Sequence, residues 1–252
     1  MTGRFWHPPH APLRSSVIRA LTAGLLLILG YAPIVASETM SGADYIRRSV
    51  LFFAIAALVV FSRVTVRHPF PRFGAANVVT TVRVAIAAGI AALIGEPPSN
   101  RIAWLLVAAV GTVAALDGLD GWLARRSGYT SAFGARFDME TDAALILIVS
   151  VLVWQHGKAG AWVVLCGLMR YGFVAAGWVL PWMAGPLRST IRGKSAAVAQ
   201  FVGLAIALLP VVPVPYSAVV AAITLGILIW SFAVDIAWLR RQSALTGSRA
   251  NS

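Results

Sequence analysis

The chain has 252 residues, of which 59% are hydrophobic and 12% charged, and its net charge at neutral pH is +12. Soluble globular domains carry about 25% charged residues, so this composition excludes an ordinary soluble protein. The basic residues lie at the ends of apolar segments rather than on one polar face, so the charge does not indicate nucleic-acid binding. The apolar segments do not alternate with polar residues, which excludes a β-barrel.

Eight apolar segments follow one another along the chain, each about long enough to cross the hydrocarbon core as a helix. Prolines such as Pro97, Pro98 and Pro186 stand in the connections between them. The sequence therefore predicts an all-α polytopic membrane protein. The predicted spans are 17–37, 49–66, 74–95, 102–126, 137–155, 159–184, 195–213 and 217–239.

Polar residues divide the chain into three predicted regions. Residues 1–72 form an N-terminal extension with two transmembrane helices, and residues 73–239 form a six-helix core that holds the dense polar features and is therefore the candidate for any catalytic site. Residues 240–252 form a polar cytoplasmic tail. With eight spans both termini share one side of the membrane.

Basic residues are distributed unequally between the two sides. Of the 21 Lys and Arg residues, two lie within spans, at Arg83 and Arg170, and four flank the side opposite the termini, leaving fifteen on the side of the termini. The positive-inside rule places that side in the cytoplasm. We therefore expect a multi-pass protein of a bacterial inner membrane, with both termini and the polar stretch described next facing the cytoplasm.

Five of the nine acidic residues lie in one stretch of this apolar chain, LDGLDGWLARRSGYTSAFGARFDMETDAAL, residues 116–145. Asp117 and Asp120 are three apart, and Asp138 and Asp142 are four apart, so each pair shares a face of its helix. A short loop joins the two predicted helices, which are therefore expected to be antiparallel neighbours. The two carboxylate pairs are predicted to converge.

Converging carboxylates repel one another near the membrane, and a hard divalent cation is the usual remedy. Two such ions can bind the attacking oxygen and the leaving oxygen when a phosphoryl group is displaced. Gly121 and Ala124 leave the carboxylate face open for a ligand, Arg125 could neutralise a phosphate, and Gly134 permits a tight turn. The alternative is that the acids are solvated or paired with nearby arginines; intramembrane charges are costly and usually functional.

The stretch reads Asp117-x-x-Asp120-Gly121-x-x-Ala124-Arg125, then eight residues, Gly134, three residues, Asp138, three residues and Asp142. This order resembles the signature of the CDP-alcohol phosphatidyltransferase family. The resemblance covers residues 73–239. It implies transfer of a substituted phosphate, typically phosphatidyl from CDP-diacylglycerol, to an alcohol with release of CMP, in phospholipid biosynthesis.

The resemblance also implies roles for individual residues. Asp117, Asp120 and Asp138 would bind two Mg²⁺ or Mn²⁺ ions, and Asp142 would complete this metal site and act as the catalytic base on the acceptor hydroxyl. Cytidine and its phosphates would be bound by Asp117, Gly118, Gly121, Ala124, Arg125 and Gly134.

A polar stripe at the start of the third span consists of Asn77, Thr80 and Arg83, spaced by three. Interhelical hydrogen bonding would explain it without a ligand. The family often has Asn-x-x-Thr-x-x-Arg here, which favours nucleotide contacts for Asn77 and Thr80. Arg83 would hold an acidic partner or a phosphate.

Four further basic residues are candidates for binding the acceptor or a phosphate: Arg170, Arg188, Arg192 and Lys194. The last three also suit an ordinary positive flank. Tyr171 follows Arg170, where some relatives have an acidic residue. The segment GKSAAVAQ, residues 193–200, resembles an element of the members that use glycerol phosphate or inositol phosphate, but it lacks their second Lys and their Thr. An anionic acceptor of that kind is favoured, but a neutral alcohol stays open.

The main alternative is a divalent-cation transporter, because intramembrane carboxylates also mark ion pathways. Such a protein would spread its acids through the membrane depth, whereas here they cluster at one end. A homodimer is expected from resemblance to related proteins. Glu140 points away from Asp138 and Asp142, so no role is assigned to it.

Overall fold

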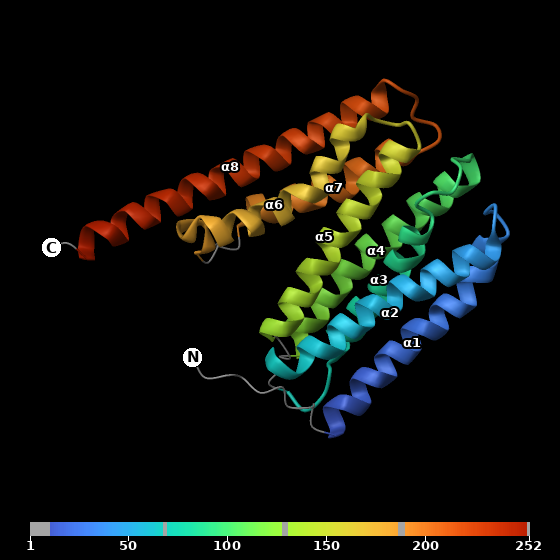
Figure 1. Cartoon of the computed structure of the whole chain (residues 1–252), viewed down its shortest axis with the longest axis horizontal. Helices are drawn as coiled ribbons and strands as arrows, with labels where there is room; N and C mark the ends of the chain where they lie inside the picture. The colour runs from blue at the N-terminus through green and yellow to red at the C-terminus, as the bar shows by residue number, and fades with distance from the viewer. Residues whose placement is uncertain (1–10, 68–69, 128–130, 186–189, 251–252) are drawn as a thin grey trace. The chain divides into compact units, whose positions relative to one another are not determined.

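The computed structural model describes residues 11–67, 70–127, 131–185 and 190–250, and this part of the chain is helical without any strand (Figure 1). Its elements are α1 (Ala11–Ala36), α2 (Gly42–Arg67), α3 (Ala75–Ala92), α4 (Asn100–Ser127), α5 (Ala132–Gln155), η1 (Ala161–Val164), α6 (Leu165–Val179), η2 (Pro181–Ala184), α7 (Ile191–Leu208) and α8 (Tyr216–Ala250). The predicted all-α architecture is confirmed.

Seven described helical segments are long and apolar enough to cross a membrane: Pro12–Ala36, Gly42–Val64, Ala75–Ala92, Asn100–Leu123, Ala161–Val179, Ile191–Leu208 and Tyr216–Ser243. The protein is therefore an integral, multi-pass membrane protein. Eight spans were predicted, and α5 makes the difference. Every 18-residue stretch of α5 contains Asp138, Glu140 and Asp142, so its charge, not its length, sets it apart.

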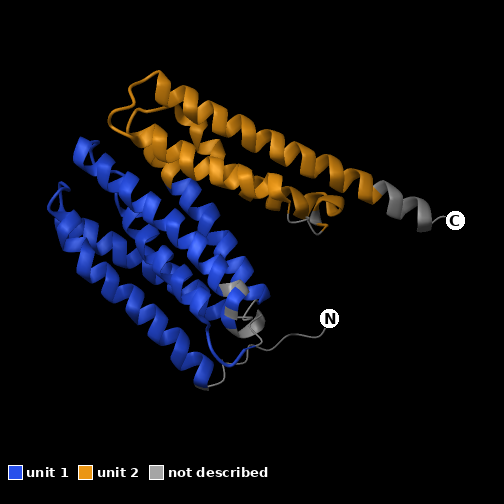
Figure 2. Cartoon of the chain, turned by 180° about the vertical axis from the view of Figure 1, so that it is seen from behind, with its two compact units in different colours: residues 1–148 blue, residues 149–252 orange. Residues whose placement is uncertain are grey.

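The chain forms two compact units, residues 1–148 and 149–252 (Figure 2). The first unit contains α1 to α4 and most of α5. Within it α1 packs against α2 and α3, and α3 packs against α2 and α4. The predicted N-terminal extension is thus part of the same compact unit as the first helices of the predicted core.

Small residues let the extension approach the core closely. A Cβ atom added to Gly89 of α3 would lie 2.2 Å from the hydroxyl oxygen of Tyr31 on α1. That hydroxyl donates a hydrogen bond to the Ala85 carbonyl at 2.9 Å. Close packing around small residues is how membrane helices associate when lipid is as apolar as their side chains.

Each end of the extension has its own attachment to the core helices. At the end where α2 finishes, a buried apolar cluster joins α1 and α2 to the start of α3 and α5; its buried members are Leu13, Val17, Ala20, Val60, Val64, Phe73 and Phe133. At the opposite end Arg48 pairs with Glu96 at 2.7 Å, and Glu96 accepts a hydrogen bond from the Met40 backbone at 3.0 Å.

The second unit is held together by α7 and α8. Gly203 lies so close to Thr224 that an added Cβ would approach the Thr224 Cγ2 to 1.9 Å, and Gln200 donates a hydrogen bond to the Thr224 carbonyl at 2.5 Å. Helix α8 continues past its predicted end at 239 to Ala250. The single predicted span 159–184 is divided into η1, α6 and η2.

Candidate active site

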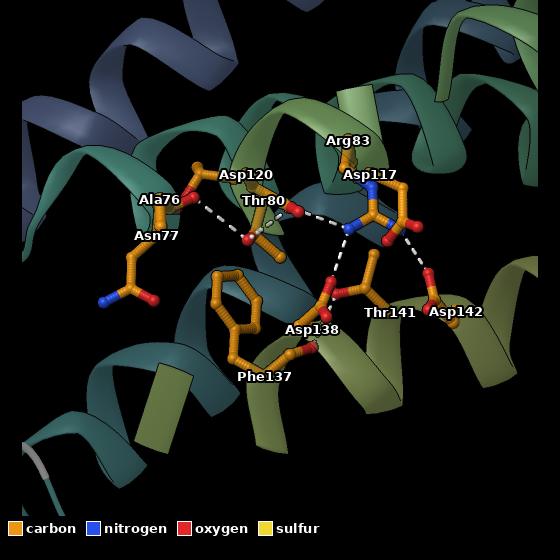
Figure 3. Close-up of polar contacts among 11 residues, drawn as sticks. Ala76, Asn77, Thr80, Arg83, Asp117, Asp120, Phe137, Asp138, Thr141 and Asp142 are labelled. Carbon is orange, nitrogen blue, oxygen red and sulfur yellow. Dashed lines mark hydrogen bonds and ion pairs between the residues drawn. The ribbon is translucent and has the colours of Figure 1, made fainter. Parts of the chain in front are cut away.

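Four aspartates and one arginine meet inside the first unit, at the end where α4 finishes and α5 begins (Figure 3). Asp117 and Asp120 come from α4, Asp138 and Asp142 come from α5, and Arg83 comes from α3. The predicted convergence of the two carboxylate pairs is therefore seen in the structure. It arises as expected from the i, i+3 and i, i+4 spacings on neighbouring helices.

The Arg83 guanidinium contacts all four carboxylates. Its Nη2 lies 2.9 Å from Asp117 Oδ1 and also contacts Asp142 Oδ1. Its Nη1 lies 2.8 Å from Asp120 Oδ2 and 2.5 Å from Asp138 Oδ1. The Arg83 side chain is completely buried. The planar fork of arginine suits such multiple contacts, which a lysine ammonium could not reproduce.

The four aspartates explain how an arginine can lie within a membrane span at position 83. An arginine within a membrane span needs a counter-charge or a wet cavity, and four carboxylates supply it here. The sequence prediction gave Arg83 an acidic partner or a phosphate but did not place it at the centre of the aspartates. Residue spacing along one helix cannot predict the position of Arg83 among the aspartates, because that position depends on how α3 is rotated toward α4 and α5.

Thr80 and Asn77 lie on the same face of α3 as Arg83 but differ in their contacts. The Thr80 hydroxyl lies 3.1 Å from Asp120 Oδ2 and bonds to it, so it orients a carboxylate that is itself buried. Asn77 instead donates a hydrogen bond back to the Phe73 carbonyl at 2.5 Å. The structure thus brings Thr80 into contact with the aspartates, while Asn77 supports the start of α3.

The donor set fits a divalent cation. One carboxylate oxygen each from Asp117, Asp120 and Asp138 lies within 4.8 Å of the other two. Oxygens bound to one Mg²⁺ lie at most about 4.2 Å apart, since each is 2.0–2.1 Å from the ion, so a small inward movement would suffice. Asp142 is outside this group of three, although it was also predicted to be a ligand.

Local charge supports the same interpretation. Four aspartates facing one arginine leave a formal charge of about −3 when all are ionised. Asp120 is buried and the other three carboxylates are partly buried, which makes their mutual repulsion more costly than it would be in water. A hard cation with oxygen ligands relieves this repulsion, and phosphates can complete its coordination.

The glycines of the stretch have two different surroundings. Gly118 is exposed on α4, and a Cβ added there would meet nothing within 4 Å, so a ligand could approach the backbone. Gly134 is a close-packing position, since an added Cβ would lie 2.9 Å from Asn77 Oδ1. Gly121 is partly buried. Ala124 and Arg125 lie on α4, and their side chains are outside the described residues.

The remaining basic candidates belong to the second unit. Arg192 on α7 pairs with Asp235 and contacts both the carbonyl and the hydroxyl of Ser231 on α8. Lys194 is exposed, and Arg170 lies on α6. Arg188 is outside the described residues. The Arg192–Asp235 pair was not anticipated from the sequence, because the two residues are 43 positions apart.

The profile of one family, CDP-alcohol phosphatidyltransferase, matches residues 73–234. The chain belongs to this family. The match begins just before α3, includes Arg83 and all four aspartates, and leaves α1 and α2 outside it. No solved structure matches the chain.

Family membership makes the protein a transferase of substituted phosphate groups, and this favours the enzyme over a cation transporter. The family transfers phosphatidyl groups from a CDP-linked donor to an alcohol in membrane phospholipid synthesis, and it depends on divalent metal. The aspartate cluster of this chain is the part of the described structure that suits such a metal.

Proposed function

We propose that the protein transfers the phosphatidyl group of CDP-diacylglycerol to the hydroxyl of an alcohol and releases CMP. The observation that carries the proposal is the meeting of Asp117, Asp120, Asp138 and Asp142 around one buried arginine, within the residues that match the family. A site for a pyrophosphate and two divalent cations needs several carboxylate oxygens as ligands.

We assign Asp117, Asp120 and Asp138 as ligands of Mg²⁺ or Mn²⁺, with two ions bound and Asp142 completing their site. When bound, these ions supply charge stabilisation to the pyrophosphate and to the leaving CMP. Gly118, Gly121, Ala124 and Arg125 bind cytidine and its phosphates in this proposal. Gly134 and Asn77 support the turn into α5 through their close contact.

In the reaction, the acceptor oxygen attacks the phosphorus that bears the diacylglycerol. The new P–O bond forms as the bond to the CMP phosphate breaks, and CMP leaves with the bonding electrons. Asp142 takes the proton of the acceptor hydroxyl. Arg83 holds Asp142 and Asp138 in position from the buried side.

Positive flanks orient the protein in this proposal. Both termini and the aspartates face the cytoplasm of a bacterial inner membrane, and α5 crosses the membrane as an eighth span. Its 24 residues extend about 36 Å at 1.5 Å per residue, which exceeds the hydrocarbon thickness. We also propose a homodimer, for which crosslinking of the purified protein is the test.

The acceptor is proposed to be an anionic alcohol, glycerol 3-phosphate or an inositol phosphate. We assign Lys194, which is exposed at the start of α7, to the binding of this anion, together with Arg170 and Arg188. Arg192 is already paired with Asp235, so its contribution is to fix α7 against α8.

The experiment is CMP release by purified protein in lipid nanodiscs containing CDP-diacylglycerol, with a panel of acceptors. Glycerol 3-phosphate and inositol phosphate are compared with glycerol, inositol and serine, each with Mg²⁺ and with a chelator. Release that needs both Mg²⁺ and an anionic alcohol is expected. Equal release with glycerol and glycerol 3-phosphate would contradict the assignment of the acceptor.

A further inference from the structure

A cavity lies on the other side of α5 from the aspartates. It has a volume of about 400 Å³ and is formed by α2 and α5, with the lining residues Val59, Val60, Arg63, Phe133, Arg136, Phe137 and Glu140. This size is within the range of small-ligand sites. Because α2 precedes residue 73, the cavity combines a helix outside the family match with the helix that carries Asp138 and Asp142.

The cavity is separate from the aspartate site. Phe133, Arg136, Phe137 and Glu140 follow an i, i+3, i+4, i+7 pattern, which is one face of a helix. Asp138 and Asp142 lie on roughly the opposite face and contact Arg83. The cavity therefore explains where Glu140, the acid left without a role, is directed.

The inner wall of the cavity is apolar. Val60 and Phe133 are buried members of the apolar cluster that joins the extension to the core. Phe137 stacks on Phe133 with ring centroids 5.8 Å apart and lies 6.5 Å from the ring of Phe73. A hydrocarbon chain would be a suitable neighbour for these side chains.

The outer rim is charged, with a net positive balance from two arginines and one glutamate. The ion pair between Arg136 and Glu140 is weak, because Arg136 Nε and Glu140 Oε1 are 4.0 Å apart and the two side chains are 61% and 43% exposed. Arg63 is exposed and makes no ion pair with any other residue of the described ranges. Two guanidinium groups beside an apolar wall match a phosphate attached to hydrocarbon.

We propose that this groove between α2 and α5 binds one anionic phospholipid, distinct from the substrates at the aspartates. Its phosphate is held by Arg63 and Arg136, and one acyl chain lies along Val59, Val60, Phe133 and Phe137. Basic pockets between transmembrane helices favour anionic lipid headgroups for the same electrostatic reason. The helical extension thereby supplies half of a lipid site that residues 73–234 alone do not contain.

Binding is measured on the full-length protein in detergent, with a chelator present and no CDP-linked donor, so that the result does not depend on the catalytic proposal. A photoactivatable phosphatidylglycerol is crosslinked to the protein, and its adducts are mapped by mass spectrometry. Adducts are expected in the segments 59–63 and 133–140. Adducts confined to other segments would overturn the proposal.

Affinity for phosphatidylglycerol is then compared among variants by native mass spectrometry. The double variant Arg63→Gln/Arg136→Gln is expected to bind at least about tenfold more weakly. Val59→Trp keeps both charges but fills the groove, and it is expected to lose binding to a similar extent. The matched control is Arg47→Gln/Arg101→Gln, which removes two exposed arginines from the opposite end and should bind as the wild type does.

Two outcomes identify a different ligand. Equal affinity for phosphatidylcholine would show that the groove does not select an anionic headgroup. Displacement of phosphatidylglycerol by millimolar inorganic phosphate would show a site for free phosphate instead of lipid. Wild-type affinity in Arg63→Gln/Arg136→Gln, with the wild-type elution volume retained, would also refute the assignment.

Discussion

At the scale of single residues, Arg83 determines how four acids can lie close together, because its buried guanidinium contacts all of them. It is the completely buried cation of the site, and each of its terminal nitrogens contacts two carboxylates. Removing one partner of a buried ionic network leaves the other charges uncompensated. The loss of stability when Arg83 is removed therefore depends on whether another cation, such as Mg²⁺, can bind to the carboxylates in its place.

Arg83→Gln is expected to destabilise the purified protein in the absence of metal by about 3–5 kcal/mol, because four carboxylates lose their counter-charge. Millimolar Mg²⁺ should restore part of this loss by binding to Asp117, Asp120 and Asp138. The measurement is thermal unfolding in detergent with and without Mg²⁺. Identical thermal stability of the variant and the wild type in a chelator would contradict the central role of Arg83.

Two glycines of the signature stretch should respond differently to the same substitution. Gly134→Ala places a Cβ against Asn77 and Ser131, and it is expected to cost about 1–3 kcal/mol of stability. Gly118→Ala meets open space inside a helix, so its thermal stability should stay the same or rise by up to about 1 kcal/mol. Its CMP release should fall, since the nucleotide loses its approach to the backbone. Thermal unfolding and CMP release separate the two effects; equal loss of stability in both variants would refute this distinction.

The sequence predicted the residues of the site better than their contacts. Spacings of three and four place Asp117 with Asp120 and Asp138 with Asp142 on shared faces, and a short loop makes the two helices neighbours. These facts depend only on helix geometry. The position of Arg83 among the carboxylates and the pairing of Arg192 with Asp235 depend on the rotation of packed helices, which no local pattern encodes.

At the scale of helices, the N-terminal extension contacts the start of α3 and α5 at one end and the connection between α3 and α4 at the other. Apolar packing joins one end, and the buried pair of Arg48 with Glu96 joins the other. A second pair, Arg101 with Glu38, lies nearby, with the Arg101 side chain 80% exposed. Burial should decide how much each pair contributes.

Glu96→Gln is expected to lower the free energy of unfolding by about 2 kcal/mol, because the buried end of the pair loses its charge-assisted hydrogen bonds. Glu38→Gln is the matched control, and its effect should be below about 1 kcal/mol, since its partner is solvated. Thermal or denaturant unfolding of the two variants checks the difference. An equal effect of both substitutions would contradict the inferred attachment.

Span boundaries were predictable to within a few residues where apolar runs end at Pro or Arg. Helix α5 was predicted to span because its second half is apolar, yet its first half is charged enough to separate it from the seven apolar segments. Asp138, Glu140 and Asp142 lower the hydropathy of α5, and two of them, Asp138 and Asp142, belong to the cluster around Arg83. The acids that meet Arg83 lower the hydropathy that a membrane span needs, so hydropathy alone describes this helix poorly.

At the scale of the whole molecule, whether α5 crosses the membrane decides which side of it the ends of the later helices face. In a variant with Cys166 replaced by Ala, single cysteines are introduced at Asn100, Lys158 and Ser243. With eight spans, the first two should react with a membrane-impermeant maleimide added outside intact spheroplasts, and the third only after permeabilisation. Reaction of Cys at Ser243 from outside, with protection at Lys158, would show that α5 does not cross.

The central claim is that the aspartates around Arg83 transfer a phosphatidyl group. Its most direct test uses CDP-diacylglycerol with ³²P in the phosphate that bears the diacylglycerol, together with Mg²⁺ and an acceptor chosen from the panel above. Wild-type protein, and the surface control Asp44→Asn, should move the label into a new phospholipid while unlabelled CMP is released. Asp138→Asn should reduce this transfer at least 100-fold, as expected for loss of a metal ligand of the reacting phosphates. Label released as a water-soluble phosphate, or full transfer by Asp138→Asn, would contradict the account.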